Sequence, residues 1–355
     1  RAIGIAAREN YLFTVDFGDP AFTVTDVSNP SSPEIKTRIT LTGNPSGIRL
    51  KGDYAYISAA RAGVHIVDIS DPLNPVKVST FDTTGQTRDG AIDGDYFYGA
   101  DSESGLVIID ISDPLNPTLK GHLDTDGHTY HIKVVGNYAY LADNANGIKV
   151  VDISDPGNPV LASAFNSSDS SSFAYGVNIY GNYAYLSCRG AGLEIYDISD
   201  PTSPGTPVYV DTNDLSFDIK IKGDYAYVAD YRSGLAIINI SDPTNPGTPV
   251  YMSTKGYAIG VDVKGDYAYV ANNDQGLAII NISNPANPGN PIYVDTNGAS
   301  VAVTVAGDYA YVADAGAGLV IIDISDPTNP GSPINIVTNG SPGDVTVAVS
   351  YTHLT

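Results

Sequence analysis

The chain has 355 residues, with 40 acidic and 18 basic side chains and a formal net charge of −22. This excess of negative charge disfavours nucleic acid and anionic membranes as partners. It suits a secreted or salt-exposed protein, or one that binds divalent cations, although solubility alone would also explain it. No apolar run reaches the roughly 18 residues that a membrane span needs, and the single cysteine, Cys188, excludes an intrachain disulfide while leaving the compartment open.

One unit recurs along the chain. In its clearest copy, residues 222–251, Gly-Asp precedes Tyr-Ala-Tyr-Val-Ala, followed by a loop closing on Gly, a Leu/Ile run and Ser-Asp-Pro-x-Asn-Pro. The first tyrosine of each copy, which we call the marker tyrosine, recurs every 42 to 45 residues, at Tyr11, Tyr54, Tyr96, Tyr138, Tyr183, Tyr225, Tyr267 and Tyr309. Eight copies at this period predict an all-β propeller of eight four-stranded blades, because one blade takes about 40–45 residues.

Each unit is predicted to form four strands. In repeat seven these are residues 259–264, 267–272, 277–282 and 291–294, and Gly265-Asp266 forms a tight turn between the first two. The second strand alternates tyrosine with small residues and the third is apolar on both faces, so the sheet must be covered on both sides. We expect the tyrosine side of each blade to pack on the alanine side of the next. Seven blades with an unclosed remainder, or part of a longer array, are the alternatives.

In chain order, repeat one occupies residues 1–43 and has a degraded third strand at 22–27. The only sizeable insertion lies within residues 166–173, before repeat five, and residues 344–347 match a first strand once more. We predict one propeller domain over residues 1–348 and a non-native tail, translated from a sequencing adapter, over residues 349–355. Because Arg1 lies in mid-repeat, we interpret the chain as a metagenomic fragment or a mature form, with further domains beyond both ends as an open alternative.

The third strands carry a recognisable signature. Residues 106–110 (LVIID), 148–152 (IKVVD) and 319–323 (LVIID), with the Ile-Ser-Asp-Pro that trails them, resemble the LVIVD-repeat family. This resemblance implies a β-propeller, commonly in bacterial or archaeal surface and secreted proteins, and implies no single activity and no catalytic motif. The sequence departs from the signature at Asn239 and Asn281, which argues that the acidic residue at this position has a structural role.

Residues that recur in every blade are expected to serve the fold, since one ligand cannot contact them all. The recurrent Asp of Ser-Asp-Pro, such as Asp71, is predicted to cap a turn, with Ca²⁺ binding as the alternative. A second acidic set ends the second strands, where it is predicted to cap the next turn and to make the channel mouth negative, which could attract a cation or a polyhydroxylated ligand. This set comprises Asp16, Asp101, Asp143, Asp230, Asn272 and Asp314.

Residues that break the repeat are the functional candidates. The position seven residues before the marker tyrosine should open the first strand at the channel mouth, and it reads Gly4, Gly47, Asp89, His131, Gly176, Asp218, Gly260 and Ala302. The weak catalytic candidates are therefore Asp89, His131 and Asp218. Repeats three and four adjoin, so Asp89 and His131 can approach each other, and the two could bind a divalent transition metal or act as an acid–base pair. Polar lining of a wet channel is the alternative.

Four further residues near this position are candidate ligand contacts, namely Arg88, His128, Tyr130 and Arg189. No cofactor is expected, with Ca²⁺ or a divalent transition metal as the alternative. The leading functional hypothesis is an extracellular or cell-surface interaction module that binds protein or glycan. A hydrolase or lyase with its site at the channel mouth is the second hypothesis, and a structural spacer in a larger surface protein is the third. Whether the protein is an enzyme stays open, and the absence of catalytic motifs argues against it.

Overall fold

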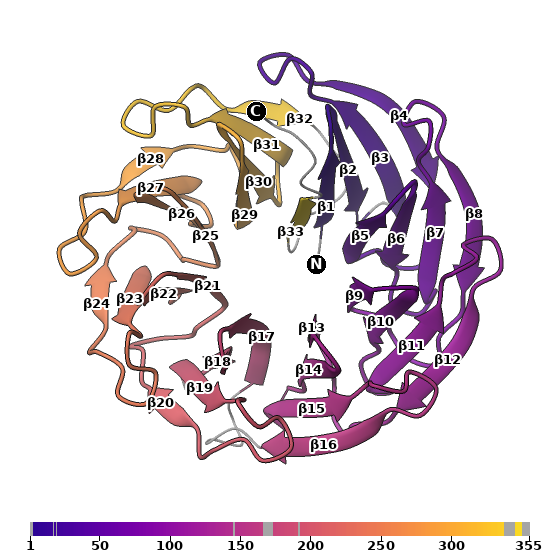
Figure 1. The fold of residues 1–355 in the computed structure, drawn as a ribbon. Coiled ribbons are helices and arrows are strands. Elements are labelled where there is room, and N and C mark those ends of the chain that lie inside the picture. Colours follow the sequence, from indigo (N-terminus) through magenta and orange to yellow (C-terminus); the bar gives the residue numbers. More distant parts are fainter. Residues whose placement is uncertain are drawn as a thin grey trace.

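The computed structural model describes residues 3–16, 18, 20–144, 146–165, 173–190 and 192–336, together with the backbone strand at 345–349. Within these ranges the protein is all-β, and eight sheets are arranged around a central channel (Figure 1). The prediction of eight four-stranded blades is confirmed, and the alternative of seven blades with a remainder is wrong. Most of the predicted insertion, residues 166–172, and residues 350–355 of the predicted tail lie outside the described residues.

The blades are numbered one to eight in chain order, and within each blade all strand pairs are antiparallel. The first strands line the channel: Ile3–Arg8 (β1), Gly47–Lys51 (β5), Asp89–Asp93 (β9), His131–Val135 (β13), Phe173–Tyr180 (β17), Asp218–Lys222 (β21), Gly260–Lys264 (β25) and Ser300–Ala306 (β29). The second strands each begin at a marker tyrosine: Tyr11–Asp16 (β2), Tyr54–Ser58 (β6), Tyr96–Ala100 (β10), Tyr138–Ala142 (β14), Tyr183–Arg189 (β18), Tyr225–Ala229 (β22), Tyr267–Ala271 (β26) and Tyr309–Asp314 (β30).

The third strands hold the Leu/Ile runs: Ala21–Asp26 (β3), Val64–Asp68 (β7), Leu106–Asp110 (β11), Ile148–Asp152 (β15), Gly192–Asp197 (β19), Leu235–Asn239 (β23), Leu277–Asn281 (β27) and Gly318–Asp323 (β31). The fourth strands form the outer wall: Glu34–Thr40 (β4), Val76–Phe81 (β8), Thr118–Leu123 (β12), Val160–Phe165 (β16), Val208–Val210 (β20), Val250–Met252 (β24), Ile292–Val294 (β28) and Ile334–Ile336 (β32).

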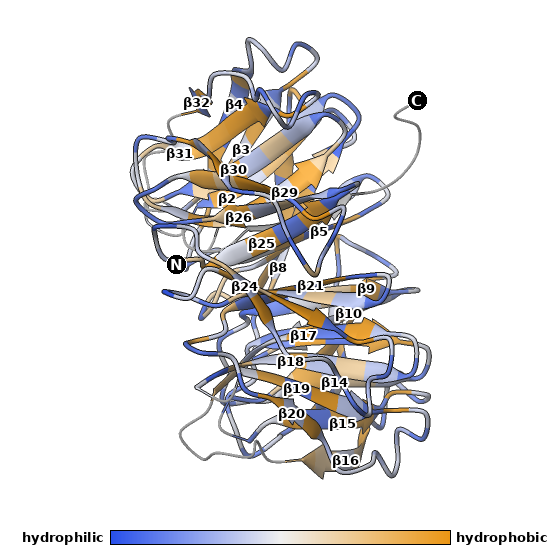
Figure 2. Cartoon of the chain, turned by 90° about the vertical axis from the view of Figure 1, so that its left-hand side faces the viewer, coloured by the Kyte–Doolittle hydropathy of each residue, from blue (hydrophilic) through white to orange (hydrophobic). Residues whose placement is uncertain are grey.

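The core is divided among the interfaces between blades. On β26, Tyr269 and Ala271 pack against Ala310 and Val312 of β30 in the next blade, and the interfaces from blade three to blade seven repeat this arrangement. The apolar strands accordingly alternate with polar loops when the molecule is viewed from the side (Figure 2).

Two interfaces differ: Tyr56 meets Phe97 between blades two and three, and Tyr311 clusters with Leu12 between blades eight and one. The prediction that the tyrosine side of each blade meets the alanine side of the next is confirmed from blade three to blade eight, where a large ring faces a small residue, and is wrong at these two interfaces.

Each first strand joins the second through a two-residue turn, as predicted. In repeat seven Gly265 adopts φ 53°, a left-handed conformation that glycine enters without strain. Several of these turns accept a basic side chain from the preceding blade. The Lys51 ammonium, for example, donates to the Gly94 carbonyl at 2.7 Å and pairs with Asp95 at 2.8 Å. Arg8, Lys222 and Lys264 make equivalent contacts. These links between blades were not anticipated from the sequence.

A final strand, Val345–Val349 (β33), lies parallel to β1, with Ile3 opposite Val345. It occupies the innermost position of the first sheet, whose order is β33-β1-β2-β3-β4 (Figure 1). Residues 345–347, which match a first strand in sequence, therefore do form a strand, but it pairs parallel to β1 within the first sheet and does not open another blade.

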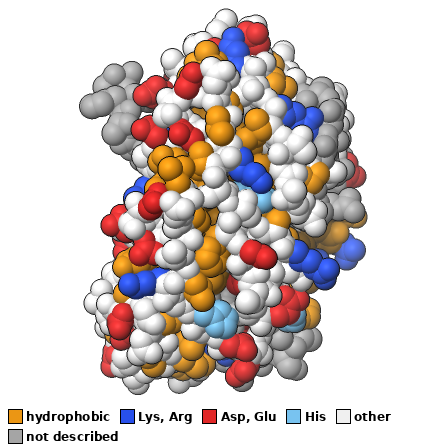
Figure 3. Space-filling model, turned by 90° about the vertical axis from the view of Figure 1, so that its right-hand side faces the viewer, with side chains coloured by type: hydrophobic (Ala, Val, Ile, Leu, Met, Phe, Trp, Pro, Cys, Tyr) orange, Lys and Arg blue, Asp and Glu red, His pale blue; other side chains and the backbone are white. Residues whose placement is uncertain are grey.

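The outer wall differs between the two halves of the ring. Strands β4, β8, β12 and β16 have six or seven residues, and each contains a β-bulge against its neighbour. Strands β20, β24, β28 and β32 have only three, because a Gly-x-Pro precedes them and proline cannot donate to a sheet. Exposed aliphatic side chains, among them Leu73, Val76 and Leu119, lie on this wall in the first half, where Figure 3 shows a band of hydrophobic side chains.

Candidate functional site

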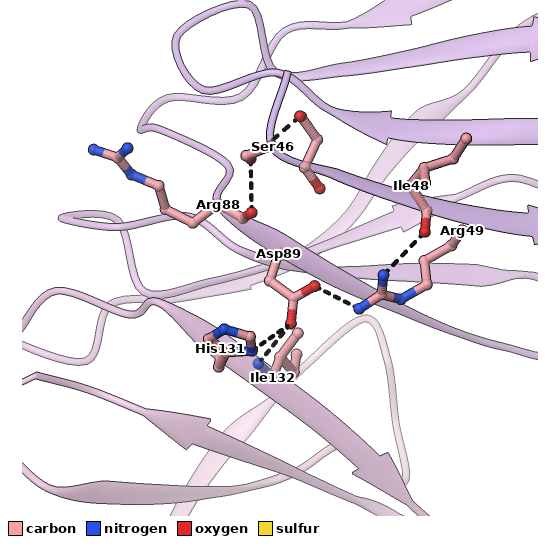
Figure 4. A network of polar contacts seen from close by, with 8 residues as sticks. Ser46, Ile48, Arg49, Arg88, Asp89, His131 and Ile132 are labelled. Carbon is pink, nitrogen blue, oxygen red and sulfur yellow. Dashed lines mark hydrogen bonds and ion pairs between the residues drawn. The ribbon is translucent and has the colours of Figure 1, made fainter. Parts of the chain in front are cut away.

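The channel mouth brings two of the predicted site residues together. His131 begins β13 and Asp89 begins β9, and Nδ1 of His131 lies 3.2 Å from Oδ2 of Asp89 (Figure 4). The two strands are neighbours around the channel, so their first side chains point to the same place. A carboxylate that holds an imidazole fixes its orientation and stabilises its protonated form, which is the geometry of an acid–base pair.

The Asp89 carboxylate also has two partners besides His131. Its Oδ1 pairs with the Arg49 guanidinium at 2.6 Å, and its Oδ2 accepts the backbone N–H of Ile132 at 3.3 Å (Figure 4). Burial would raise the pKa of the Asp89 carboxyl, but Arg49, then His131 and Lys133, outweigh burial and hold this pKa well below its usual range. Asp89 therefore stays ionised and can orient His131, but it cannot itself act as a proton donor near neutral pH.

The contact from Asp89 to Ile132 belongs to a pattern. First strands are sheet edges, so they carry backbone N–H groups without a partner in their own sheet. Asp218 accepts the N–H of Val261 at 3.0 Å and Asp262 that of Val305 at 2.8 Å, each in the following blade. The hydrogen bond to Val261 is a structural reason for an aspartate at position 218. It lies two blades beyond His131 and is bonded to blade seven, so its catalytic role stays only a prediction.

Further charges line the channel five residues before the marker tyrosines, a position that the sequence reasoning did not consider. This position holds Arg49, Lys133, Lys220 and Asp262. Burial and Arg49 lower the pKa of the Lys133 ammonium, while Asp89 and Asp218 oppose them. Lys133 is surrounded by protein yet remains open to the water of the channel. The channel thus has paired charges of both signs, which agrees with polar lining of a wet channel.

Above the channel, aromatic rings and arginines form a continuous arc over blades three to seven, which we call the mouth arc. Tyr130 stacks on Tyr175 with ring centroids 5.7 Å apart, and Tyr231 stacks on Tyr257 at 4.4 Å. Cation–π and ring contacts connect these pairs. In order, the mouth arc consists of Arg88, Tyr130, Tyr175, Arg189, Phe217, Tyr231 and Tyr257.

The two arginines of the mouth arc are bound mainly by rings. The Arg88 guanidinium lies 5.9 Å from the Tyr130 centroid and donates to Oε1 of Gln86 at 3.0 Å. The Arg189 guanidinium lies 5.5 Å from the ring of Tyr175 and 4.7 Å from that of Phe217, and it donates to the Tyr175 hydroxyl at 3.4 Å. Within the described part of the chain, neither arginine pairs with a carboxylate, and neither Nε has an acceptor.

Three of the four predicted ligand contacts, Arg88, Tyr130 and Arg189, therefore lie in one arc. The fourth, His128, is exposed beside it, with Nδ1 3.9 Å from a Glu103 oxygen. The sequence reasoning missed Tyr175, Phe217, Tyr231 and Tyr257. The sequence does indicate some of these residues, at the position just before the one that opens each first strand. Eight residues before the marker tyrosine, repeats three to six read Arg88, Tyr130, Tyr175 and Phe217, and the other repeats read Ile3, Ser46, Ile259 and Val301.

The recurrent acids at the ends of the second strands are predicted to cap the next turn. Asp314 does so, accepting the N–H of Gly316 at 2.8 Å, whereas Asp101, Asp143 and Asp230 bond the connection that precedes their first strand. Oδ1 of Asp101 accepts the hydroxyls of Thr83 at 2.8 Å and Thr87 at 2.9 Å. Asp101, Asp143 and Asp230 have no exposed surface, so they do not themselves contact a ligand at the mouth, and a negative mouth stays a prediction. Burial raises the pKa of each of the three carboxyls, against the hydrogen bonds that lower it.

The acids of Ser-Asp-Pro also cap turns. Asp71 accepts the N–H of Leu73 at 3.0 Å and the side-chain amide of Asn74 at 2.8 Å. Among the described residues, no three His, Cys, Asp or Glu side chains gather where they could hold a metal ion. Metal binding by His131 and Asp89 stays a prediction. A depression of about 330 Å³ lies away from these residues, lined by residues 208–211 and 244–249.

The fold and the repeat define the class of protein as a β-propeller of LVIVD repeats. The LVIVD repeat matches eight times, at residues 1–40, 42–83, 84–125, 126–167, 173–212, 216–250, 255–296 and 297–338. The chain therefore belongs to the LVIVD-repeat family. No curated protein is similar enough in sequence to count as a relative. Within the described residues, no helix has the length and apolar character to cross a membrane.

Solved structures of the same fold have varied functions. A computationally designed protein, Ika8, matches with a TM-score of 0.70 and 11% identity, covering 90% of this chain and 95% of its own. BamB from Moraxella catarrhalis matches with a TM-score of 0.66 and 15% identity, and the match covers 89% of this chain and 92% of BamB. The dihydro-heme d1 dehydrogenase NirN, in complex with DHE, matches with a TM-score of 0.72 and 15% identity, and the match covers 96% of this chain and 75% of NirN. At these identities the similarity extends to the fold alone.

Proposed function

We propose that the chain is an interaction module that binds a protein or glycan ligand through the mouth arc. The observation that carries this proposal is the arc itself, an unbroken row of partly exposed rings and guanidinium groups over five adjacent blades. Aromatic and arginine side chains that remain partly exposed are the residue types most enriched at binding sites. These aromatic side chains are not needed to close the propeller, since four of its eight blades contribute none to the arc.

We also propose an extracellular or cell-surface location. The large negative charge and the single buried cysteine suit such a protein. A periplasmic gluconolactonase from Pseudomonas aeruginosa, PpgL, has the same fold, with a TM-score of 0.57. Expression of the intact gene in a bacterial host, followed by fractionation, tests this location, and recovery in the cytoplasmic fraction would contradict it.

The binding proposal is tested by screening the purified protein against arrays of glycans and of surface-protein fragments. We expect Tyr175→Ala to abolish any specific signal. Tyr180→Ala is the matched control, because Tyr180 is exposed in the same blade but ends β17, away from the mouth. A signal that survives Tyr175→Ala but not Tyr180→Ala would place binding on the opposite face. No specific signal at all would favour a structural spacer.

A second candidate function is acid–base catalysis, as in a hydrolase or lyase, and the 3.2 Å contact between His131 and Asp89 is the observation that favours it. In this hypothesis His131 exchanges the proton while Asp89 orients the imidazole. Metal analysis of the purified protein, with His131→Ala as the comparison, tests the related metal hypothesis. A bound transition metal or a turnover that disappears with His131→Ala would support the enzyme. A metal-free, inactive wild-type protein would contradict it.

A further inference from the structure

The mouth arc differs in electrostatic character from the chain as a whole. The protein has more than twice as many acidic as basic side chains, so an arginine usually has a carboxylate available. Among the described residues, neither Arg88 nor Arg189 has a carboxylate at ion-pair distance, and the Glu103 carboxylate acts on Arg88 only from further away. Arg88 donates to a neutral amide oxygen and Arg189 to a phenol oxygen. Both guanidinium groups therefore keep their positive charge uncompensated by a direct contact, at the point of the surface where the rings gather.

The arrangement of the rings strengthens this positive character. An aromatic ring has a negative face and a positive edge. Tyr130 has the Arg88 guanidinium over its ring and is stacked with Tyr175, which in turn has Arg189 over its ring. The ring faces are thus covered by cations or by other rings.

A stacked guanidinium still offers its N–H donors in its own plane. Because stacking uses only the flat face, the donor fork stays available for an oxyanion that approaches along the edge, and a carboxylate fits this fork with two parallel hydrogen bonds. Nε of Arg88 and Nε of Arg189 are buried without an acceptor within the described part of the chain, so a ligand reaches each of these arginines through its terminal Nη groups. Two such forks flank the Tyr130–Tyr175 stack, one on each side.

We propose that the mouth arc binds a carboxylate-bearing carbohydrate, such as a short uronic acid oligosaccharide, with carboxylates on Arg88 and Arg189. This proposal rests on the proposed function and specifies its ligand class. A carbohydrate is favoured over an acidic peptide because the exposed aliphatic side chains lie on the outer wall, whereas polar side chains lie beside Arg88 at one end of the arc, namely Gln86, Thr84, Ser104 and Glu103. The net charge of −22 favours a short ligand, since a long polyanion would be repelled.

The test is calorimetric titration with trigalacturonate, with its fully methyl-esterified form, and with a hexaglutamate peptide. We expect the acid trimer to bind and the ester to bind at least about tenfold more weakly, because one charged hydrogen-bonded contact is worth at least that factor. Arg88→Gln and Arg189→Gln should each weaken binding of the acid trimer by about tenfold or more and leave binding of the ester unchanged.

Arg61→Gln is the matched control. Arg61 is exposed in the loop between β6 and β7, on the mouth side but outside the arc, so its substitution alters the net charge equally and should leave affinity for the acid trimer unchanged. Arg189→Lys keeps the charge but loses the planar fork, and should recover only part of the affinity. Thermal unfolding of each variant verifies that it is folded.

Three results would overturn this proposal. The first is a dissociation constant for the acid trimer weaker than about 10 mM in the wild type. The second is equal binding of acid and ester. If Tyr175→Ala then abolishes both, the proposed function stands while the carboxylate inference falls. The third is tighter binding of hexaglutamate than of the acid trimer, with the same dependence on Arg88 and Arg189, which would make the ligand an acidic peptide.

Discussion

The two sides of the channel mouth are built on one repeat yet differ at one position. Eight residues before the marker tyrosine, blades four to six carry Tyr130, Tyr175 and Phe217, whereas blades two and eight carry Ser46 and Val301. All five side chains are half-buried, and the blades beneath them share the first three strands and apolar interfaces. The position therefore tolerates small and large residues alike, so that packing does not account for the rings gathered on one side, and the proposed ligand site would.

The largest expected effect concerns residues that both sides share. Tyr56 and Tyr185 are each 1% exposed at an interface between blades, one on each side of the ring. Tyr56→Ala and Tyr185→Ala should each lower the free energy of unfolding by about 3–5 kcal/mol, because each leaves a cavity where a ring was. Urea unfolding measures this. A large loss for only one of the two would show that the sides differ in packing and not only at the mouth.

These shared tyrosines also predict the response to alkali. Burial raises the pKa of Tyr56 to about 12 and that of Tyr185 to about 12. Stability from such groups is present below the unfolded tyrosine pKa of about 10 and is lost as the pH rises through the folded value. We expect one cooperative unfolding transition above pH of about 10, followed by tyrosine absorbance and circular dichroism. Two separate transitions would mean that the sides unfold independently.

The next effect concerns the link from blade two to blade three. Arg49→Met leaves the buried Asp89 carboxylate without its 2.6 Å partner, and should cost about 2–4 kcal/mol at pH 7. Because Arg49 helps to lower the pKa of Asp89, the stability that it supplies is present above pH of about 4 and is lost as the pH falls below that value. The difference between wild type and variant should therefore shrink in acid, and a difference independent of pH would contradict this.

A smaller change, in the free energy of ligand binding, is expected when two rings of the arc are replaced by residue types that occupy the same position in the blades outside the arc. Tyr130→Ser with Tyr175→Ile should weaken ligand binding by about tenfold to a hundredfold, because stacked rings at a binding site contribute about 1–3 kcal/mol. The melting temperature should change little, since both side chains are only half-buried. Titration of the ligand found by the array screen measures the affinity. Unchanged affinity would show that the rings at this position do not contribute to ligand binding.

The smallest effect is expected at the buried acids beneath the mouth. Asp143→Asn should change stability by less than about 1 kcal/mol at pH 7, since Asn272 occupies the same position in blade seven and an amide keeps an acceptor for Thr125 and Thr129. Because burial raises the pKa of Asp143, the wild type should lose stability relative to the Asp143→Asn variant as the pH rises from about 4 to about 7. Urea unfolding at both pH values tests this sign.

By itself, the sequence determined the architecture. Eight radially packed blades follow from the period of the marker tyrosines, the Gly-Asp turns and the third strands, which are apolar on both faces. Such sheets bury both faces only when each packs between two neighbouring sheets. The sequence also placed Asp89 beside His131, since the same strand position in adjacent blades must meet. It located Arg88, Tyr130 and Arg189 near the mouth without indicating what connects them.

Only the tertiary structure decided how side chains from different blades meet. The stack from Arg88 to Tyr257 joins residues up to 169 positions apart, and no local pattern encodes which ring lies over which guanidinium. The structure likewise buried the acids at the ends of the second strands, which the sequence had suggested would face the mouth. Hydrogen-bonded neighbours from the preceding connection cover those carboxyls, and that cover exists only once the blades are packed together.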